Sequence, residues 1–261
     1  MTTLDWRELA STRELVLTWA ARSVRVRYQQ SMLGGLWAVI QPAATVAIFS
    51  IIFTYFVPVD TGGIPYVLFS YVAMVPWTFF SASITDMTDS LVSNMNLVSK
   101  IYFPRTMLPV AALLARMVDF GIAACLIVLL MLFYRWPVNV VGLLFIPAIL
   151  AVQLALALGL GFMGAALNVF YRDVRHVITL ALQLWFYATP IIYPVSTVPE
   201  RLRPYYFLNP MAGVIEAFRD VILYQRLPGM YLAISGAVAL VVLVAGYLFF
   251  KRVEFQFADV V

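Results

Sequence analysis

The chain has 261 residues, of which 63% are hydrophobic and only 11% are charged. Soluble domains carry about 25% charged residues, so this composition excludes an ordinary soluble protein and indicates an all-α integral membrane protein. The net charge of +4 does not indicate a nucleic-acid partner, because the Lys and Arg residues are scattered and form no basic patch. We expect a single membrane domain over residues 1–261.

The first 34 residues are expected to form a cytoplasmic helix that lies along the inner face of the membrane. Within residues 5–30, Arg22 and Arg25 share one face, whereas Val16 and Trp19 belong to an apolar patch. Basic side chains at that level face anionic lipid, and Trp prefers the headgroup region. The same pattern also fits a cytosolic helix packed on its own protein.

Six stretches are apolar enough to cross a membrane, five of them within residues 35–193 and the sixth at 230–250. Each approaches the roughly 20 residues that a helix needs to cross the hydrocarbon core. In chain order, the predicted spans are 36–57, 66–84, 107–134, 138–169, 177–193 and 230–250.

Lys and Arg residues are unequally divided between the two sides of the membrane. Eleven lie on the side of the N-terminus and five on the other side, four of these in one long segment. Because cytoplasmic loops carry the excess of basic residues, we expect both termini, including the tail 251–261, in the cytoplasm.

A polar stretch at residues 93–105 separates the second and third predicted spans. Apolar residues recur at helical spacing from Leu91 and Met95 onward, and the polar residues of the stretch occupy another face of the same helix. Pro104 ends this helix because its ring removes an amide donor. We interpret the stretch as a surface for a cytosolic partner; by pattern alone it also fits an ordinary interfacial loop. The candidate contact residues are Asn94, Asn96, Ser99, Lys100, Tyr102 and Arg105, together with Arg172 and Asp173 in a second cytoplasmic loop.

Residues 194–229 form a connection much longer than a hairpin needs. Asn209 and Pro210 start a new helix as its N-cap and first residue, and this helix continues over 211–224. A helix of that length is too short to cross a bilayer, so we expect a re-entrant helical hairpin in the outer leaflet. A surface loop with an amphipathic helix is the alternative. The ionisable residues of this helix are Glu216, Arg219 and Asp220, and Glu216 can reach either neighbour.

Two glycine-based motifs bear on nucleotide binding. Gly159, Gly161 and Gly164 match the dinucleotide fingerprint formally, but they lie inside a predicted span and lack the strand that the motif requires. Their spacing with small neighbours instead lets helices approach closely in lipid. The chain contains no P-loop sequence, so it is not expected to hydrolyse ATP by itself.

Few ionisable residues fall within the predicted spans. Arg116 and Asp119 are three residues apart and are expected to pair across one turn. The midplane carboxylates of an ion-driven carrier are missing, so the driving force is expected from elsewhere. Asp86 and Asp89 form the closest carboxylate pair, with no basic partner evident; they are the weak basis for a membrane enzyme acting on lipid-linked sugars.

Metal chemistry has little support in the sequence. Cys125 is the single cysteine, which excludes an intrachain disulfide and a cysteine-cluster site, and His176 is the single histidine. We therefore expect no metal site.

Aromatic residues are frequent in the predicted spans. Most are expected to face lipid or the membrane interfaces, and a minority lining a passage would offer flat apolar faces to sugar rings. The candidate channel-lining residues are Phe49, Phe53, Phe56, Trp77, Phe80, Trp185 and Tyr187.

Six short motifs follow one another along the chain: VRVRYQQSMLGGLWAVIQP (24–42), NMNLVSKIYFPR (94–105), NVFYRDVRHV (168–177), YATPIIYP (187–194), FLNPMAGVIEAFRDVIL (207–223) and FKRVEFQFADVV (250–261). In their order and spacing they resemble the membrane subunits of ABC exporters of cell-surface polysaccharides, the type-2 permease class that handles O-antigen and teichoic-acid chains. The resemblance covers nearly the whole chain.

The resemblance implies a fold of six transmembrane helices with an amphipathic N-terminal helix and two re-entrant gate helices before the last span. It implies a homodimer in a bacterial inner membrane, bound to two copies of an ABC ATPase subunit that hold ATP and Mg²⁺, so that this chain needs no cofactor. The implied substrate is a polyprenyl-diphosphate-linked polysaccharide. Residues 94–105 resemble the coupling helix, Arg172 and Asp173 a second ATPase contact, and 211–224 the second gate helix. A permease for drugs or free lipids remains the alternative.

Overall fold

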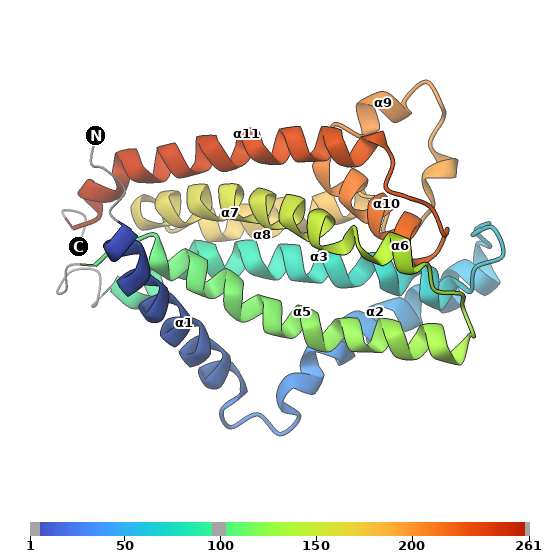
Figure 1. Cartoon of the computed structure of the whole chain (residues 1–261), viewed down its shortest axis with the longest axis horizontal. Coiled ribbons are helices and arrows are strands. Elements are labelled where there is room, and N and C mark those ends of the chain that lie inside the picture. The colour runs from blue at the N-terminus through green and yellow to red at the C-terminus, as the bar shows by residue number, and fades with distance from the viewer. Residues whose placement is uncertain (1–5, 96–102, 259–261) are drawn as a thin grey trace.

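The computed structural model describes residues 6–95 and 103–258, and every regular element in these ranges is helical (Figure 1). Long helices run side by side along the longest axis of the molecule, whereas α1 crosses the bundle obliquely at one end. The α-helices are α1 (Trp6–Tyr28), α2 (Trp37–Ile51), α3 (Tyr66–Asp89), α5 (Met107–Phe133), α6 (Val140–Leu143), α7 (Ile146–Phe170), α8 (Val174–Tyr187), α9 (Arg203–Tyr206), α10 (Pro210–Ile222) and α11 (Met230–Val253).

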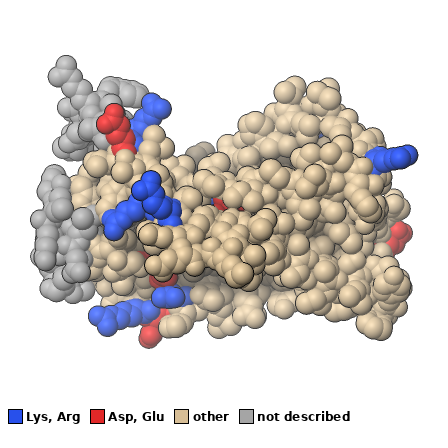
Figure 2. Space-filling view, turned by 90° about the horizontal axis from the view of Figure 1, so that it is seen from below, with Lys and Arg blue, Asp and Glu red and all other residues tan. Residues whose placement is uncertain are grey.

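Five helical segments of the described ranges are long and apolar enough to cross a membrane. They are Gly34–Phe56, Tyr66–Asp89, Met107–Phe133, Val140–Phe170 and Met230–Phe257. They correspond to five of the six predicted spans. Charged residues lie mainly at the two ends of the surface in Figure 2, with a broad uncharged middle between them, as a multi-pass membrane protein requires.

The predicted span at 177–193 corresponds to α8, which contains only 14 residues. At 1.5 Å per residue, such a helix measures about 21 Å, less than the hydrocarbon core. It ends at Tyr187 because Pro190 follows closely and disfavours helical geometry in the residue before it. The six-span topology therefore stays a prediction.

Helix α3 forms the centre of the bundle, as Figure 1 shows, and most of its side chains are buried. Its neighbours include α2, α5, α7, α8 and α10. Pro76 interrupts its amide ladder, and buried Gln153 of α7 donates a hydrogen bond of 2.7 Å to the Pro76 carbonyl. The buried polar side chain of Gln153 thus links α7 to the central helix α3.

Helices α7 and α11 pack backbone against backbone through small residues. A Cβ atom placed on Gly159 would lie 2.5 Å from the carbonyl oxygen of Val242, and one placed on Gly246 would collide with the carbonyl oxygen of Gly159. On α7, Gly161 likewise leaves room for the side chain of Met87. The prediction that these glycines serve close helix packing is confirmed.

Helix α1 packs against α5 at one end of the bundle, outside the set of spanning helices. After Tyr28 the chain reverses direction towards α2 through two residues in the left-handed region, Gln30 (φ 67°) and Gly34 (φ 51°). The helical prediction for this region is confirmed, and its placement on the membrane surface stays a prediction.

The long connection before α11 contains α9, which is a single turn, and α10. As predicted, Asn209 is the N-cap of α10, and its side-chain oxygen accepts a hydrogen bond of 3.1 Å from the Met211 amide. Most of α10 is buried, against α3, α7 and α11. The short helices of the predicted hairpin are therefore present, and their re-entry into the membrane stays a prediction.

Candidate functional site

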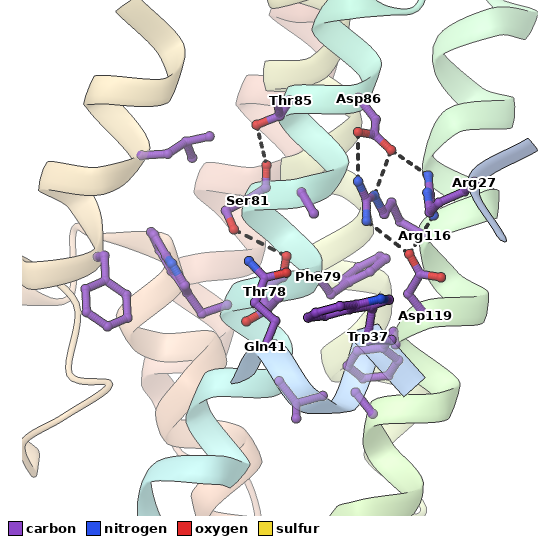
Figure 3. Close-up of a pocket in the computed structure, with 18 of the residues that line it drawn as sticks. Arg27, Trp37, Gln41, Thr78, Phe79, Ser81, Thr85, Asp86, Arg116 and Asp119 are labelled. Atoms are coloured by element: carbon purple, nitrogen blue, oxygen red, sulfur yellow. Dashed lines mark hydrogen bonds and ion pairs between the residues drawn. The ribbon is translucent and has the colours of Figure 1, made fainter. Parts of the chain in front are cut away.

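A cavity of about 620 Å³ lies between α2, α3, α5 and α8, with the end of α1 at one side (Figure 3). Its lining combines aromatic rings with uncharged groups that form hydrogen bonds. The aromatic residues include Trp37, Trp77, Phe79, Phe186 and Tyr187, and the polar ones include Gln41, Thr78, Ser81, Thr85 and Gln183. This volume lies within the range of about 300–1,000 Å³ that is usual for small-molecule sites.

Aromatic side chains from α2, α3 and α8 meet beside this cavity. The ring centroid of Trp77 lies 5.8 Å from Phe80, 6.2 Å from Trp185 and 5.8 Å from Phe186. Phe186 in turn lies 6.2 Å from Phe49. Phe186 was not a predicted channel-lining residue, but it connects six of the seven candidates into one aromatic cluster. These six are Phe49, Phe53, Trp77, Phe80, Trp185 and Tyr187. Among these six, Trp77 and Tyr187 line the cavity.

Phe56 does not join this cluster and is 75% exposed. The segment Ile52–Phe56 is a π-helix, which has more residues per turn than an α-helix. The resulting rotation separates Phe56 from the face that carries Phe49 and Phe53. That Phe56 lines a channel stays a prediction.

An ion-pair cluster of four residues closes one side of the cavity. Arg27 of α1 donates to Asp119 (2.5 Å) and to Asp86 (2.6 Å), and Arg116 donates to both oxygens of Asp86 (2.7 and 2.9 Å). Figure 3 shows Arg116 between the two carboxylates and Arg27 reaching them from α1. The two positive and two negative charges compensate one another, so this side of the cavity presents no net charge.

The predicted pairing of Arg116 with Asp119 is confirmed at 3.1 Å. The expectation that Asp86 and Asp89 lack basic partners is wrong: Arg27 and Arg116 bind Asp86, and Arg175 lies 3.3 Å from Asp89. Arginines therefore engage both carboxylates of this pair. Within the residues that the structure describes, no group of three or more His, Cys, Asp or Glu side chains is placed to hold a metal ion.

Tyr28 extends the cluster, since its hydroxyl donates to the second oxygen of Asp119. Burial, reinforced by this hydrogen bond, raises the pKa of Tyr28 to about 12. The last turn of α1 is therefore attached to α3 and α5 by two adjacent side chains.

A second cavity, of about 410 Å³, lies on the other side of the ion-pair cluster, and Arg27 and Asp86 line both cavities. Its other lining residues come from α1, α5 and the end of α3 with the turn after it, and include Trp19, Arg22 and Asn94. The cluster thus lies between an aromatic cavity inside the bundle and a second cavity beside α1. Sequence reasoning missed this role of Arg27, which is 92 residues away from Asp119.

The predicted cytoplasmic contacts are only partly described. Asn94 donates to the Ser90 carbonyl (2.9 Å), and Arg105 donates to the Glu254 carbonyl near the C-terminus. Arg172 and Asp173 are exposed at the turn between α7 and α8. The remaining candidates lie outside the described residues: Asn96, Ser99, Lys100 and Tyr102.

In α10, Arg219 is completely buried and mainly binds backbone oxygens. It donates to the carbonyls of Pro190 (2.5 Å) and Ile191 (2.8 Å), and its guanidinium lies 3.7 Å from the ring centroid of Phe69. Glu216 is 4.0 Å away, so it approaches Arg219 as predicted but forms only a loose ion pair. Arg219 therefore fixes the turn after α8 to α10 and α3.

These features define a multi-pass helical membrane protein with a neutral, aromatic cavity. The chain belongs to the ABC-2 type transporter family, whose model matches residues 14–223. It is 30% identical over 257 residues to the O-antigen export system permease protein RfbA of Myxococcus xanthus, with 97% of each chain covered. A protein of the same name from Klebsiella pneumoniae is 28% identical over 247 residues, with 95% of each chain covered.

A more distant relative is the polysialic acid transport protein KpsM of Escherichia coli. It is 22% identical over 206 residues, which cover 77% of this chain and 78% of that protein. The resemblance to type-2 ABC permeases, inferred from six short motifs, is thereby confirmed.

Proposed function

We propose that this chain is the membrane subunit of an ATP-driven exporter that moves lipid-linked polysaccharide, of the O-antigen or teichoic-acid type, from the cytoplasm across the inner membrane. The observation that carries the proposal is the 30% identity to an O-antigen export permease over 97% of both chains. The cavity lining supports it independently.

A passage for a sugar polymer must contact its substrate without holding it in one place. Aromatic rings such as Trp77 and Tyr187 offer flat faces to the apolar sides of sugar rings, and neutral groups such as Gln41 and Ser81 exchange hydrogen bonds with hydroxyls. The charges beside the cavity are compensated within the ion-pair cluster. This lining offers contacts to hydroxyl-rich sugar units and presents no net charge that would hold the chain in one place.

The proposed assembly is a homodimer in which α2 and α8 of each copy border the passage. Both helices carry large exposed apolar residues, among them Ile48 and Ile51 on α2 and Leu180 and Leu184 on α8. We further propose six crossings, with α8 as a short fifth span, α9 and α10 as re-entrant gate helices, and both termini in the cytoplasm.

The proposed energy source is a separate ATPase subunit, present in two copies, which binds ATP and Mg²⁺. The chain has no P-loop sequence of its own. Two cytoplasmic surfaces would receive the ATPase: residues 94–105, the coupling segment, and the exposed turn that carries Arg172 and Asp173.

Deletion of the gene tests the substrate. We expect surface polysaccharide to disappear and lipid-linked polymer to accumulate inside the cell, and the wild-type chain, reintroduced on a plasmid, to reverse both effects. Unchanged surface polysaccharide, with altered sensitivity to drugs or altered free lipid, would favour the other class of ABC permease and contradict this proposal.

A further inference from the structure

The C-terminal tail folds back onto the bundle after α11. It forms a short 3₁₀-helix, Glu254–Ala258, in which two phenylalanines have opposite environments. Phe255 is 78% exposed, whereas Phe257 is completely buried. The Phe257 ring lies 5.5 Å from Phe250 and 5.8 Å from Phe170, measured between ring centroids.

Phe257 belongs to a small apolar core that is separate from the core around α3. This second core contains Leu91, which precedes the coupling segment, and Met107, which follows it, and Met95 and Phe103 near the two ends of the segment pack against it. The coupling segment is thus attached at both of its ends to the core that Phe257 fills.

Arg105 connects the coupling segment to the tail by a polar contact as well. Its guanidinium donates to the Glu254 carbonyl and lies 5.8 Å from the ring centroid of Phe257. Glu254 is itself held by Lys251, whose ammonium group lies 2.9 Å from a carboxylate oxygen. The tail is therefore fixed to the end of α11 and contacts Arg105 through both backbone and ring.

Phe257 also packs next to the helix end that leads into the other proposed ATPase surface. Phe170, its neighbour at 5.8 Å, is the last residue of α7 and lies two positions before Arg172. One buried ring near the C-terminus thus lies between two cytoplasmic surfaces that are more than 60 residues apart in the sequence.

We propose that Phe257 is a positioning residue for export: it holds the two described ends of the coupling segment, at Met95 and Phe103, and the turn at Arg172 and Asp173 in a fixed relative geometry, so that the ATPase displaces both surfaces together. The proposal rests on the proposed function for the identity of the partner. Its physical basis is that packed aromatic cores transmit displacement because they deform little.

The first test compares two alanine variants of the same tail in the complex with the ATPase. In Phe257→Ala we expect normal membrane insertion, co-purification with the ATPase and continued ATP hydrolysis, but on the order of tenfold less polysaccharide exported per ATP, the size of a typical coupling between sites. Phe255→Ala, which removes an exposed ring, is expected to match wild type. Phe257→Leu, which restores apolar volume, is expected to recover most of the export.

Equal export per ATP in Phe257→Ala and Phe255→Ala would overturn the proposal while leaving the proposed function intact. Failure of the wild-type complex to export polysaccharide would instead overturn the proposed function. A loss of export in Phe257→Ala that follows only from a loss of the protein or of its complex would assign Phe257 to stability alone and would also overturn the proposal.

The second test uses the full-length chain without the ATPase, so its result does not depend on the proposed function. Replacing the single cysteine by Cys125→Ser permits spin labels at Ser93→Cys, directly before the coupling segment, and at Arg172→Cys on the turn between α7 and α8. We expect a narrow distribution of label distances in this background and after Phe255→Ala, and a broad one after Phe257→Ala. Arg105→Gln, which removes the polar contact to the tail, is expected to broaden it too. Unchanged distributions in both variants would contradict the proposal.

Discussion

Arg219 is the largest completely buried side chain in the described part of the protein. A buried guanidinium is tolerated where most of its donors find acceptors, and here the carbonyls of Pro190 and Ile191 accept from the two terminal nitrogens, whereas Nε has no partner among the described residues. Phe69 covers its planar face. The turn that ends α8 therefore depends on one side chain from α10.

Arg219→Met keeps much of the volume but leaves those carbonyls without a donor. We expect the free energy of unfolding to fall by about 3 kcal/mol, because buried acceptors without partners are costly. Arg226→Met, at an exposed position beyond the end of the same helix, is the control and is expected to change little. Thermal unfolding of the purified protein measures both variants, and equal melting temperatures would refute the assignment.

The ion-pair cluster is expected to be energetically coupled. In a double-mutant cycle of Arg27→Gln and Asp119→Asn, we expect a coupling energy of about 1 kcal/mol or more, because both side chains are largely buried and share further partners. The pair Arg175 and Asp89 is the control: its arginine is 60% exposed, so its coupling is expected near zero. If the coupling energy of Arg27 with Asp119 were no larger than that of Arg175 with Asp89, the ion-pair cluster would not hold α1 against the bundle.

Tyr28 makes part of the stability depend on pH. Its pKa in the folded protein, about 12, lies above the ordinary value near 10. Its contribution is therefore complete below about pH 10 and is lost as the pH rises through about 12. Tyr28→Phe is expected to lose less stability over this window than wild type, and Tyr55→Phe, at an exposed position, to behave like wild type. Identical melting curves against pH for wild type and Tyr28→Phe would argue against the buried hydrogen bond.

At this scale, sequence reasoning succeeded where partners are close in the chain. Arg116 and Asp119 are three residues apart in a helix, so the pattern predicts their contact. Arg27 comes from another helix, and nothing in the local pattern around Asp86 indicates it. Likewise, Arg219 was expected beside Glu216, but it donates mainly to backbone carbonyls of a turn. Every residue has a backbone carbonyl, so the sequence does not indicate which ones accept these hydrogen bonds.

Among the elements, α7 and α11 show the closest packing. Gly246→Ala would place a methyl group against the Gly159 carbonyl and is expected to cost about 1–3 kcal/mol of stability, the usual penalty for overpacking. Gly236→Ala in the same helix is the control, since its Cβ would lie at an ordinary 3.5 Å from Val152. Comparable melting temperatures for the two variants would show that α7 and α11 are not in backbone contact.

The positions of elements were predictable where composition alone decides them. Five of the six predicted spans correspond to helices long and apolar enough to cross a membrane, and Asn209 followed by Pro210 predicts the start of α10. The end of α8 was placed too late because hydropathy continues past Tyr187 while Pro190 ends the helix. The π-helix at Ile52–Phe56 was not predictable, since no residue type specifies it.

At the scale of the whole molecule, the cavity, the ion-pair cluster and the C-terminal tail follow one another towards the end of the bundle that carries α1. This order gives the proposed exporter a neutral passage inside the membrane and an attachment for its ATPase outside it. The sequence indicated the two ends of this arrangement through its aromatic residues and its polar stretch 93–105. The cluster between the two cavities emerged only from the fold.

The central claim is that this chain forms the passage and that a separate subunit supplies the energy. The most direct measurement is ATP hydrolysis by the purified chain alone and by its complex with the co-purified ATPase, each with and without lipid-linked polysaccharide. The account predicts no hydrolysis by the chain alone, and hydrolysis by the complex that rises when polysaccharide is added. Hydrolysis by the chain alone, or a complex that does not respond to polysaccharide, would contradict it.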